Sequence, residues 1–184
     1  MIETARLILR PWREADREAF HAMSADPEVM ATLGGVLNRE TADAYIDRNQ
    51  DNIERLGFGR WAVERLEDCA FIGAVGLAPI HESLPLPAGF EMGWRLARHA
   101  WGAGYASEAA RAAIADAFDR IGLTELYAFT GRPNLRSQAT MARVGLERAP
   151  ELDFDHPTLA EGDPLRPHLV YVSRAPTAAP SARS

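Results

Sequence analysis

The sequence predicts an α/β fold in which helices cover both faces of one mixed sheet. Stretches that alternate apolar and polar residues, as half-buried strands do, are interspersed with stretches whose apolar residues recur every three or four positions, as in amphipathic helices. In chain order these stretches read βααβββαβαβ, without an internal repeat or a heptad array. The length of 184 residues fits one domain, which we assign to residues 1–174.

The first half of the chain is expected to contain four strands and two helices. Asn38 is a good N-cap for the longer helix, and Gly57 and Gly59 end it. Pro27 marks the end of the shorter helix, and the short link at residues 67–68 predicts a hairpin between the second and third strands. We place the strands at 5–12, 59–66, 69–80 and 89–97, and the helices at 13–23 and 38–56.

The second half is expected to begin with an alanine-rich helix that starts after Tyr105 and ends near Gly122. A strand at 125–130, a helix from Asn134 to Gly145, an optional short strand near Leu146 and a last strand at 168–173 complete the sheet. Between them, residues 149–167 are rich in proline and acidic side chains, which indicates an ordered but irregular excursion. The tail at 175–184 has the composition of a disordered end.

The composition argues against several classes of function. The formal charge of −6 disfavours general nucleic-acid binding, which depends on basic patches. The longest mostly apolar run, residues 70–80, is too short for a membrane-spanning helix. Cys69 is the single cysteine and the N-terminus does not read as a secretory signal, so we expect a cytoplasmic protein without disulfides.

A glycine turn between a strand and a helix is the most informative feature of the chain. Gly102 and Gly104 flank Ala103, and glycines so placed let backbone amides approach a ligand closely. The helix that follows adds unpaired N–H groups and the positive end of its dipole, which suit a phosphate-bearing ligand. A P-loop is excluded because the chain contains no lysine, and a dinucleotide-binding turn is disfavoured because Ser107 holds the place of its third small residue. An acyl-CoA site is the remaining candidate.

Several motifs, in order along the chain, together resemble one family. They are the opening TARLILRPW, the turn WGAGYASEA with its alanine-rich helix, the run Asn134-Leu135-Arg136-Ser137, and the run Val144-Gly145-Leu146. In this order and spacing they resemble the GCN5-related N-acetyltransferase (GNAT) superfamily, and within it the branch of the ribosomal-protein N-terminal (RimJ/RimL-type) acetyltransferases. The resemblance extends over nearly the whole chain, up to Arg174.

The resemblance implies acetyl-CoA as the acetyl donor, bound to a strongly twisted, mostly antiparallel sheet. The strand of Glu91 would splay from the strand of Tyr127, and the gap would receive the pantetheine arm. The residues implied to pair with this arm are Met92, Gly93, Trp94, Arg95 and Leu96, and those implied to hold the diphosphate through their amides are Trp101, Gly102, Ala103, Gly104, Tyr105 and Ala106. His99 stands where the family often has Gln or Arg, which leaves such backbone contacts unaffected.

Acetyl transfer to an amine needs a donor to the developing oxyanion and a proton source for the leaving thiolate. We expect the oxyanion donor to be a backbone N–H near Met92 or Gly93. Many members of the family carry a tyrosine as the proton donor, but the matching position here is Met141, so the resemblance makes Ser137 the candidate acid and Asn134 a ligand of the cofactor. A serine early in a helix can also serve only its local backbone, and both interpretations stay open.

A base for the acceptor amine has two candidates. Glu91 lies on the strand expected to face the acceptor, although it could simply form a surface ion pair with Arg95 on the same strand face. His156 titrates near neutrality, although it could be a loop residue held by hydrogen bonds. Glu108 is assigned to the first turn of its helix as a capping residue. The histidines and Cys69 lack the spacing of zinc ligands, so no metal is implied.

The chain is therefore expected to be an acetyl-CoA-dependent N-acetyltransferase that works by direct attack in a ternary complex. The acceptor would be a primary amine, either a protein N-terminal α-amino group or a small-molecule amine. The acidic segment 151–163 either attracts such a cation or is a solvated loop. The alternative function is a non-catalytic acyl-CoA-binding or regulatory domain, which Met141 favours. No nucleic-acid or membrane partner is expected, and the family implies a monomer or a homodimer.

Overall fold

A computed structural model of the chain describes residues 1–176. Its strands are β1 (Ile2–Glu3), β2 (Leu7–Arg10), β3 (Arg60–Arg65), β4 (Phe71–Pro79), β5 (Phe90–Leu96), β6 (Glu125–Gly131), β7 (Glu147–Arg148), β8 (Phe154–Asp155) and β9 (Pro167–Arg174). They form one nine-stranded sheet in the order β1-β2-β3-β4-β5-β6-β9-β7, and β8 pairs with β9 off this path. Only β5 and β6 pair in parallel among these residues. The mixed, mostly antiparallel fold is confirmed.

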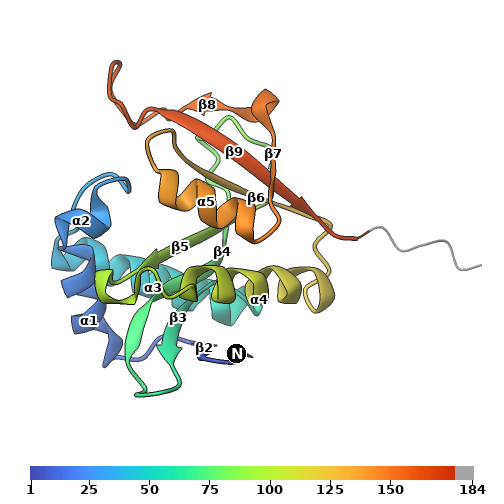
Figure 1. The fold of residues 1–184 in the computed structure, drawn as a ribbon. Coiled ribbons are helices and arrows are strands. Elements are labelled where there is room, and N and C mark those ends of the chain that lie inside the picture. The colour runs from blue at the N-terminus through green and yellow to red at the C-terminus, as the bar shows by residue number, and fades with distance from the viewer. Residues whose placement is uncertain (177–184) are drawn as a thin grey trace, which may run out of the picture.

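The helices lie on both faces of this sheet, as the sequence predicts. They are α1 (Asp16–Ser24), α2 (Pro27–Met30), α3 (Arg39–Leu56), α4 (Tyr105–Asp119) and α5 (Leu135–Arg143), with 3-10 turns η1 (Arg98–Ala100) and η2 (Pro150–Leu152). Figure 1 shows α4 in front of the strands and α3 behind them, while α5 lies beside β6. Within residues 1–176, no helix combines the length and the apolar character that crossing a membrane requires.

The helix boundaries follow local backbone chemistry. The side chain of Asn38 accepts a hydrogen bond from the Thr41 N–H at 2.8 Å, and Gly57 ends α3 in a left-handed conformation with φ of 77°. Both assignments are confirmed. The first helix, α1, ends at Ser24, before Pro27 as expected, but Pro27 also opens α2 behind the N-cap Asp26, a short helix that the sequence analysis did not predict. A proline fits the first helical position, because the backbone N–H of any residue there would lack an intrahelical partner.

Besides α2 and the turn η1, three more short pieces of structure escape the sequence pattern. They are the two-residue strands β1 and β8 and the turn η2, which are too short to show a periodicity. The short strand expected near Leu146 is confirmed as β7, one residue further along. Of the predicted disordered tail, residues 177–184 lie outside the described residues, and Ala175 donates its N–H to the Thr124 carbonyl at 2.9 Å.

Different kinds of side chain pack the helices against the two faces of the sheet. On one face Trp12, Phe20, Tyr45 and Phe71 form an aromatic cluster in which the Phe20 and Tyr45 rings stack at 4.9 Å. On the other face, α4 turns small buried residues toward the sheet, namely Ala109, Ala110, Ala113 and Ala117. Small side chains let the helix backbone approach closely, so the start of α4 is held firmly beside β5.

The sheet is interrupted between β5 and β6. Strand β5 pairs with β4 along its whole length, but it pairs with β6 at one position only, where Glu91 lies opposite Tyr127. The edge of β5 beyond Glu91 therefore lacks a strand partner among the described residues. This is the separation between the strands of Glu91 and Tyr127 that the family resemblance implies.

Candidate active site

The open edge of β5 presents a defined set of backbone groups. The Ile80 N–H bonds to the Gly89 carbonyl and the Ala97 N–H to the Ile72 carbonyl, both at 2.9 Å. In an antiparallel pair such direct bonds recur at every second residue, so the register directs the N–H and C=O of Gly93 toward Gly76 on β4. The alternate residues of β5, Met92 and Trp94, direct their backbone groups the other way, toward the side of β6. The parallel bridge between Glu91 and Tyr127 runs through the neighbours of Glu91, so the Met92 N–H is paired with the Tyr127 carbonyl. The Met92 carbonyl and both backbone groups of Trp94 stay open, and neither expected oxyanion donor, Met92 or Gly93, has a free N–H.

A cavity of about 410 Å³ lies along this edge and brings the three catalytic candidates together. Glu91, Ser137 and His156 all line it, and they come from β5, from α5 and from the segment between β8 and β9. The predicted pantetheine-binding residues on its wall are Met92, Gly93, Trp94 and Arg95. Leu96 and Asn134 are not part of this wall. The Leu96 carbonyl instead accepts a hydrogen bond from the Trp101 indole at 2.9 Å.

The glycine turn lies directly before the N-terminus of α4. Gly102 and Gly104 have φ of 77° and 83°, the left-handed region that other residues adopt only with strain. Gly104 is the N-cap of α4 and provides no side-chain cap, so the first-turn amides of this helix are free of an intrahelical or capping partner. Gly104 also lines a second hollow of about 700 Å³, whose wall carries three arginines, Arg6, Arg111 and Arg143.

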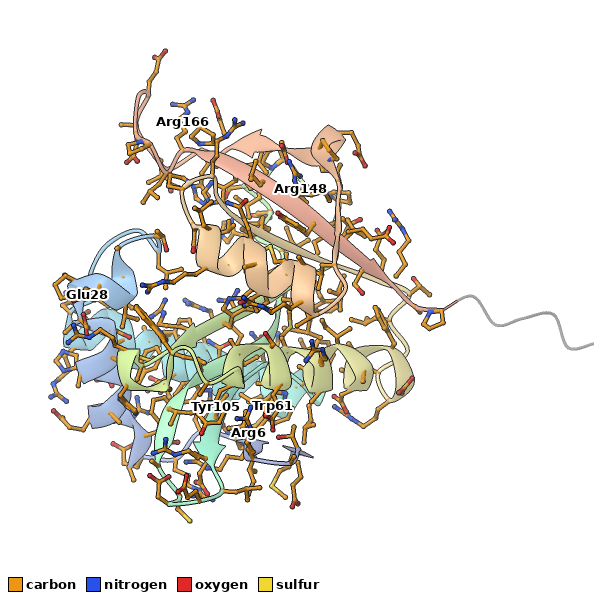
Figure 2. All side chains as sticks on the ribbon, in the orientation of Figure 1. Arg6, Glu28, Trp61, Tyr105, Arg148 and Arg166 are labelled. Carbon is orange, nitrogen blue, oxygen red and sulfur yellow. The ribbon has the colours of Figure 1, made fainter. Side chains whose placement is uncertain are left out.

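Aromatic and cationic side chains flank this turn. The Arg136 guanidinium lies 4.3 Å from the centroid of the Trp101 ring, and the Arg6 guanidinium lies 4.5 Å from that of Tyr105. Figure 2 shows Arg6 next to Tyr105 below the start of α4. Arg6 is further fixed by an ion pair with Glu108 at 2.6 Å. Glu108 thus has a structural role, as expected, but it ties α4 to the N-terminal strands through Thr4 and Arg6 and is not the capping residue that the sequence suggested.

Ser137 keeps its hydroxyl hydrogen available. The Asn134 side chain accepts a hydrogen bond from the Ser137 backbone N–H and donates one to Ser137 Oγ, both at 3.1 Å. Because an amide nitrogen can only donate, Ser137 Oγ is the acceptor in the second contact, and its own O–H can point into the cavity. Met141, one turn further along α5, lines the same cavity and is buried. Asn134 is therefore the N-cap of α5 and orients Ser137.

Glu91 forms an ion pair with a residue that the sequence did not indicate. Its Oε1 lies 2.6 Å from Nη2 of Arg60 on β3, and Arg95 is not its partner. Burial opposes the charge of Arg60, but the nearby carboxylate of Glu91 raises the Arg60 pKa overall. Within residues 1–176, Glu91 Oε2 makes no hydrogen bond, so this oxygen can receive an ammonium group.

Two histidines meet at the far wall of the cavity. The rings of His156 and His168 lie 4.9 Å apart. Burial, followed by the neighbouring His168, lowers the pKa of His156, and burial likewise lowers the pKa of His168. Nδ1 of His156 accepts a hydrogen bond from the Thr158 N–H, whereas Nδ1 of His168 must donate to the Arg166 carbonyl. In the neutral forms, His168 therefore keeps an unprotonated Nε2 and His156 does not.

Sequence reasoning missed many residues of the cavity wall, among them Tyr45, Arg60 and His168. Arg60 and His168 lie at or near the ends of ordinary strands, and Tyr45 belongs to the apolar face of α3. Nothing in their local spacing distinguishes them from other strand and helix residues. Their role depends on contacts between segments far apart in the sequence.

The acidic segment 151–163 is largely committed to local contacts. Asp153 pairs with Arg148 at 2.7 Å, and Asp155 lies 3.3 Å from Arg166. Figure 2 labels both arginines at the β8 and β9 end of the molecule. Asp163 accepts a hydrogen bond from a backbone N–H two residues further on. Within residues 1–176, no group of three or more His, Cys, Asp or Glu side chains is arranged to hold a metal ion.

Comparisons with known proteins point to one family. Residues 6–147 match the family described as acetyltransferase (GNAT) domain. The chain is 31% identical over 176 residues to the FsC-acetyl coenzyme A-N(2)-transacetylase of Aspergillus fumigatus, covering 88% of this chain and 73% of that protein. It superposes on the crystal structure of an acetyltransferase from Agrobacterium tumefaciens with a TM-score of 0.77 at 28% identity, covering 95% of this chain and 94% of that chain.

A further solved structure shows likeness of fold alone. It is RimL, described as a ribosomal L7/L12 alpha-N-protein acetyltransferase in complex with coenzyme A. Its TM-score is 0.73 at 16% identity, covering 93% of this chain and 95% of that chain. The names of the Aspergillus fumigatus relative and of RimL thus refer to different acceptors.

Proposed function

The chain belongs to the GNAT acetyltransferase family and is an acetyl-CoA-dependent N-acetyltransferase, and we propose that it acetylates a primary amine by direct attack in a ternary complex. The observation that carries this proposal is the cavity in which the open edge of β5, Ser137 and Glu91 meet. Donor-binding and acceptor-binding groups share this one space, so both substrates can be present together.

The donor is proposed to bind along β5 and across the glycine turn. The free C=O of Met92 and the free N–H and C=O of Trp94 would pair with the amides of the pantetheine arm, much as an added strand would. The amides of the turn, from Trp101 to Ala106, would hold the diphosphate at the N-terminus of α4. The hollow beside Gly104 is lined by three arginines and by Glu3 and Glu108, so it carries one excess positive charge next to these amides.

The acceptor is proposed to enter from the side of α1 and α3. Thr32, Leu33 and Gly34, which follow α2, line this part of the cavity together with Tyr45. Glu91 is the single carboxylate on the cavity wall, so its Oε2 is the group that attracts the ammonium form of the amine. A protein α-amino group and a small-molecule amine both meet this requirement.

The residues of the cavity can divide the proton transfers between them. When bound, acetyl-CoA supplies the acetyl group, and the overall reaction turns an ammonium and a thioester into an amide, a thiol and one released proton. Glu91 takes the proton that makes the amine nucleophilic. The backbone N–H of Trp94, which is open on the β5 edge, donates to the oxygen that becomes negative. Ser137 donates its hydroxyl hydrogen to the leaving sulfur, and the second proton that the amine nitrogen loses as the amide forms restores the Ser137 hydroxyl. The proton on Glu91 is the one released overall.

Initial-rate kinetics test this proposal. Release of the free thiol would be followed while acetyl-CoA and an amine are varied together over a panel of peptides and small amines. A ternary complex predicts lines that intersect in double-reciprocal plots, whereas a covalent acetyl-enzyme predicts parallel lines. Tight acetyl-CoA binding without thiol release across the whole panel would instead support the non-catalytic acyl-CoA-binding function.

A further inference from the structure

The acceptor part of the cavity carries more positive than negative charge. Arg60 and Arg95 both line it, and Glu91 is the only carboxylate among the lining residues. His156 and His168 also line it, but burial lowers the pKa of both, so they are neutral at pH 7. Because Arg60 and Glu91 neutralise each other, the charge that remains is that of Arg95.

Arg95 has no negatively charged partner. Its Nη1 donates to Ser24 Oγ at 3.1 Å, and its guanidinium lies 5.6 Å from the Phe20 ring centroid and 5.1 Å from that of Tyr45. Within residues 1–176, it takes part in no ion pair. Burial lowers the pKa of Arg95, and the positive charge of Arg60 lowers it further.

One hydrogen-bond donor of Arg95 is left without an acceptor. Its Nε is buried and bonds to no atom of the described residues, a state shared by Nε of Arg60 and of Arg166, but of these three arginines only Arg95 also lacks a carboxylate partner among the described residues. Buried polar groups in proteins are nearly always hydrogen-bonded, because an unpaired one loses its contacts with water and gains nothing in return. The two aromatic rings meanwhile hold the guanidinium in place, so Arg95 is arranged in advance for a ligand.

We propose that Arg95 binds an anionic group of the acceptor, so that the substrate of this enzyme is an amine that also carries a negative charge. This inference rests on the proposed function, in which the amine itself lies at Glu91. A guanidinium matches the geometry of a carboxylate or a phosphate better than any other side chain. Glu91 and Arg95 are four residues apart on β5, which corresponds to about 13 Å along the strand, so the two charges of the substrate are separated by several bonds.

The acidic overall charge of the protein does not contradict this inference. Asp153 and Asp155 make local ion pairs and Asp163 accepts a local backbone hydrogen bond, whereas the two arginines line the cavity. A local positive charge in a largely enclosed space outweighs distant surface charges, which salt screens. The charge of the cavity rather than the net charge of −6 should therefore select the acceptor.

Matched pairs of amines test this inference on the unmodified enzyme. One series consists of ω-amino acids of increasing chain length and the corresponding ω-amino carboxamides, which differ only in the negative charge. A second series has a phosphonate in place of the carboxylate, and a third consists of peptides with Asp or Glu against the same peptides with Asn or Gln. The kcat/KM of the charged member is expected to be higher by about tenfold or more, because a hydrogen bond to a charged group is lost in the neutral one. The series with the largest ratio identifies the source of the anionic group.

Variants test whether Arg95 causes the preference for negatively charged acceptors. Arg95→Met keeps a long side chain against Phe20 and Tyr45 but removes the charge. It is expected to remove the difference in kcat/KM between charged and neutral acceptors. Arg95→Lys is expected to keep part of the ratio. Arg120→Met, which makes the same charge change on an exposed residue that pairs with Asp116, is the control and should keep the full ratio. Thermal unfolding of each variant shows whether it is folded.

The possible failures are distinguishable. Equal rates for charged and neutral amines, or faster acetylation of the neutral ones, would overturn the inference and leave the proposed function intact. A ratio that survives in Arg95→Met would also overturn it. Absence of thiol release with every amine of the three series would overturn the proposed function itself, and the inference with it.

Discussion

The guanidinium of Arg60 occupies the space that a side chain at Gly93 would fill. A Cβ built on Gly93 would lie 2.9 Å from Arg60 Nη2 and 3.0 Å from its Nε, both too close for ordinary contact. The Arg60 side chain passes over β5 at Gly93, and its Nη2 lies 2.6 Å from Oε1 of Glu91. The glycine on β5 therefore matters because it lets a residue of β3 orient the carboxylate of the cavity.

Gly93→Ala is expected to displace Arg60 and to lower kcat/KM. The loss should be on the order of 10²-fold, because a misplaced group in a catalytic arrangement has effects of this size. Gly89→Ala is the matched control, since a Cβ there would lie at an ordinary 3.6 Å from the Tyr127 ring. Steady-state kinetics of both variants check the prediction. Equal rates for the two variants would mean that the position of Arg60 is unimportant for turnover.

Ser137→Ala is expected to lower kcat by about 10² while the affinity for acetyl-CoA changes little. The substitution removes the hydroxyl group but keeps the bond from the backbone N–H of residue 137 to Asn134, so α5 should retain its N-cap. Single-turnover rates and calorimetric titration with acetyl-CoA separate the two effects. An unchanged rate would show that Ser137 does not donate a proton.

Glu91→Gln is expected to abolish the acidic limb of the pH profile of kcat/KM, because the glutamine cannot take the proton of the amine. His156→Ala should retain this limb, since its Nδ1 is already occupied by the Thr158 N–H. The profiles are measured with one amine over a series of buffers. If the limb disappears in His156→Ala and survives in Glu91→Gln, the roles of the two residues are reversed.

Gly102→Ala is expected to weaken CoA binding. A non-glycine residue in the left-handed conformation costs about 1–2 kcal/mol, and the new Cβ would project into open space on the ligand side of the turn. Gly122→Ala is matched to it, because Gly122 has φ of 80° and equally open surroundings at the other end of α4. Both variants should lose similar stability in denaturant unfolding, but only Gly102→Ala should raise the Kd for CoA. A similar Kd in both would argue against binding at the turn.

The free energy of unfolding is expected to fall as the pH drops below the ordinary histidine pKa of 6.5. The fold lowers the pKa of His156 and of His168, chiefly by burial, so the unfolded chain binds more protons in this range. The stability that these residues contribute is complete above the unfolded value and is lost as the pH falls toward the folded one. Replacing His168 by Asn should flatten this dependence, and replacing the exposed His81 by Asn should not. Denaturant titrations at several pH values measure it.

Most of the fold could be predicted from the sequence because its signals are local. The alternation in β5, the N-cap Asn38 and the left-handed Gly57 each depend on residues within one turn or strand. The same holds for the glycine turn before α4, which indicated the donor site. The start of α2 at Pro27 was missed because a proline is equally at home after one helix and at the first position of the next.

The acceptor half of the cavity could not be predicted from local signals. Its charges come from Arg60 on β3 and from Glu91 and Arg95 on β5, and they meet only because β4 brings these two strands into one sheet. The sequence suggested Arg95 as the partner of Glu91, and the structure gives that place to Arg60.

The sequence by itself determined the family resemblance, the order of the elements and the turn at Gly102 and Gly104, since backbone conformation and helix amphipathicity are properties of neighbouring residues. Only the tertiary structure decided which amides of β5 are open, which oxygen of Glu91 is available, and that Arg95 lacks a counter-charge. These depend on the pairing register and on burial, which arise when distant segments pack together. For this reason the donor could be inferred from the chain, and the charge of the acceptor only from the cavity.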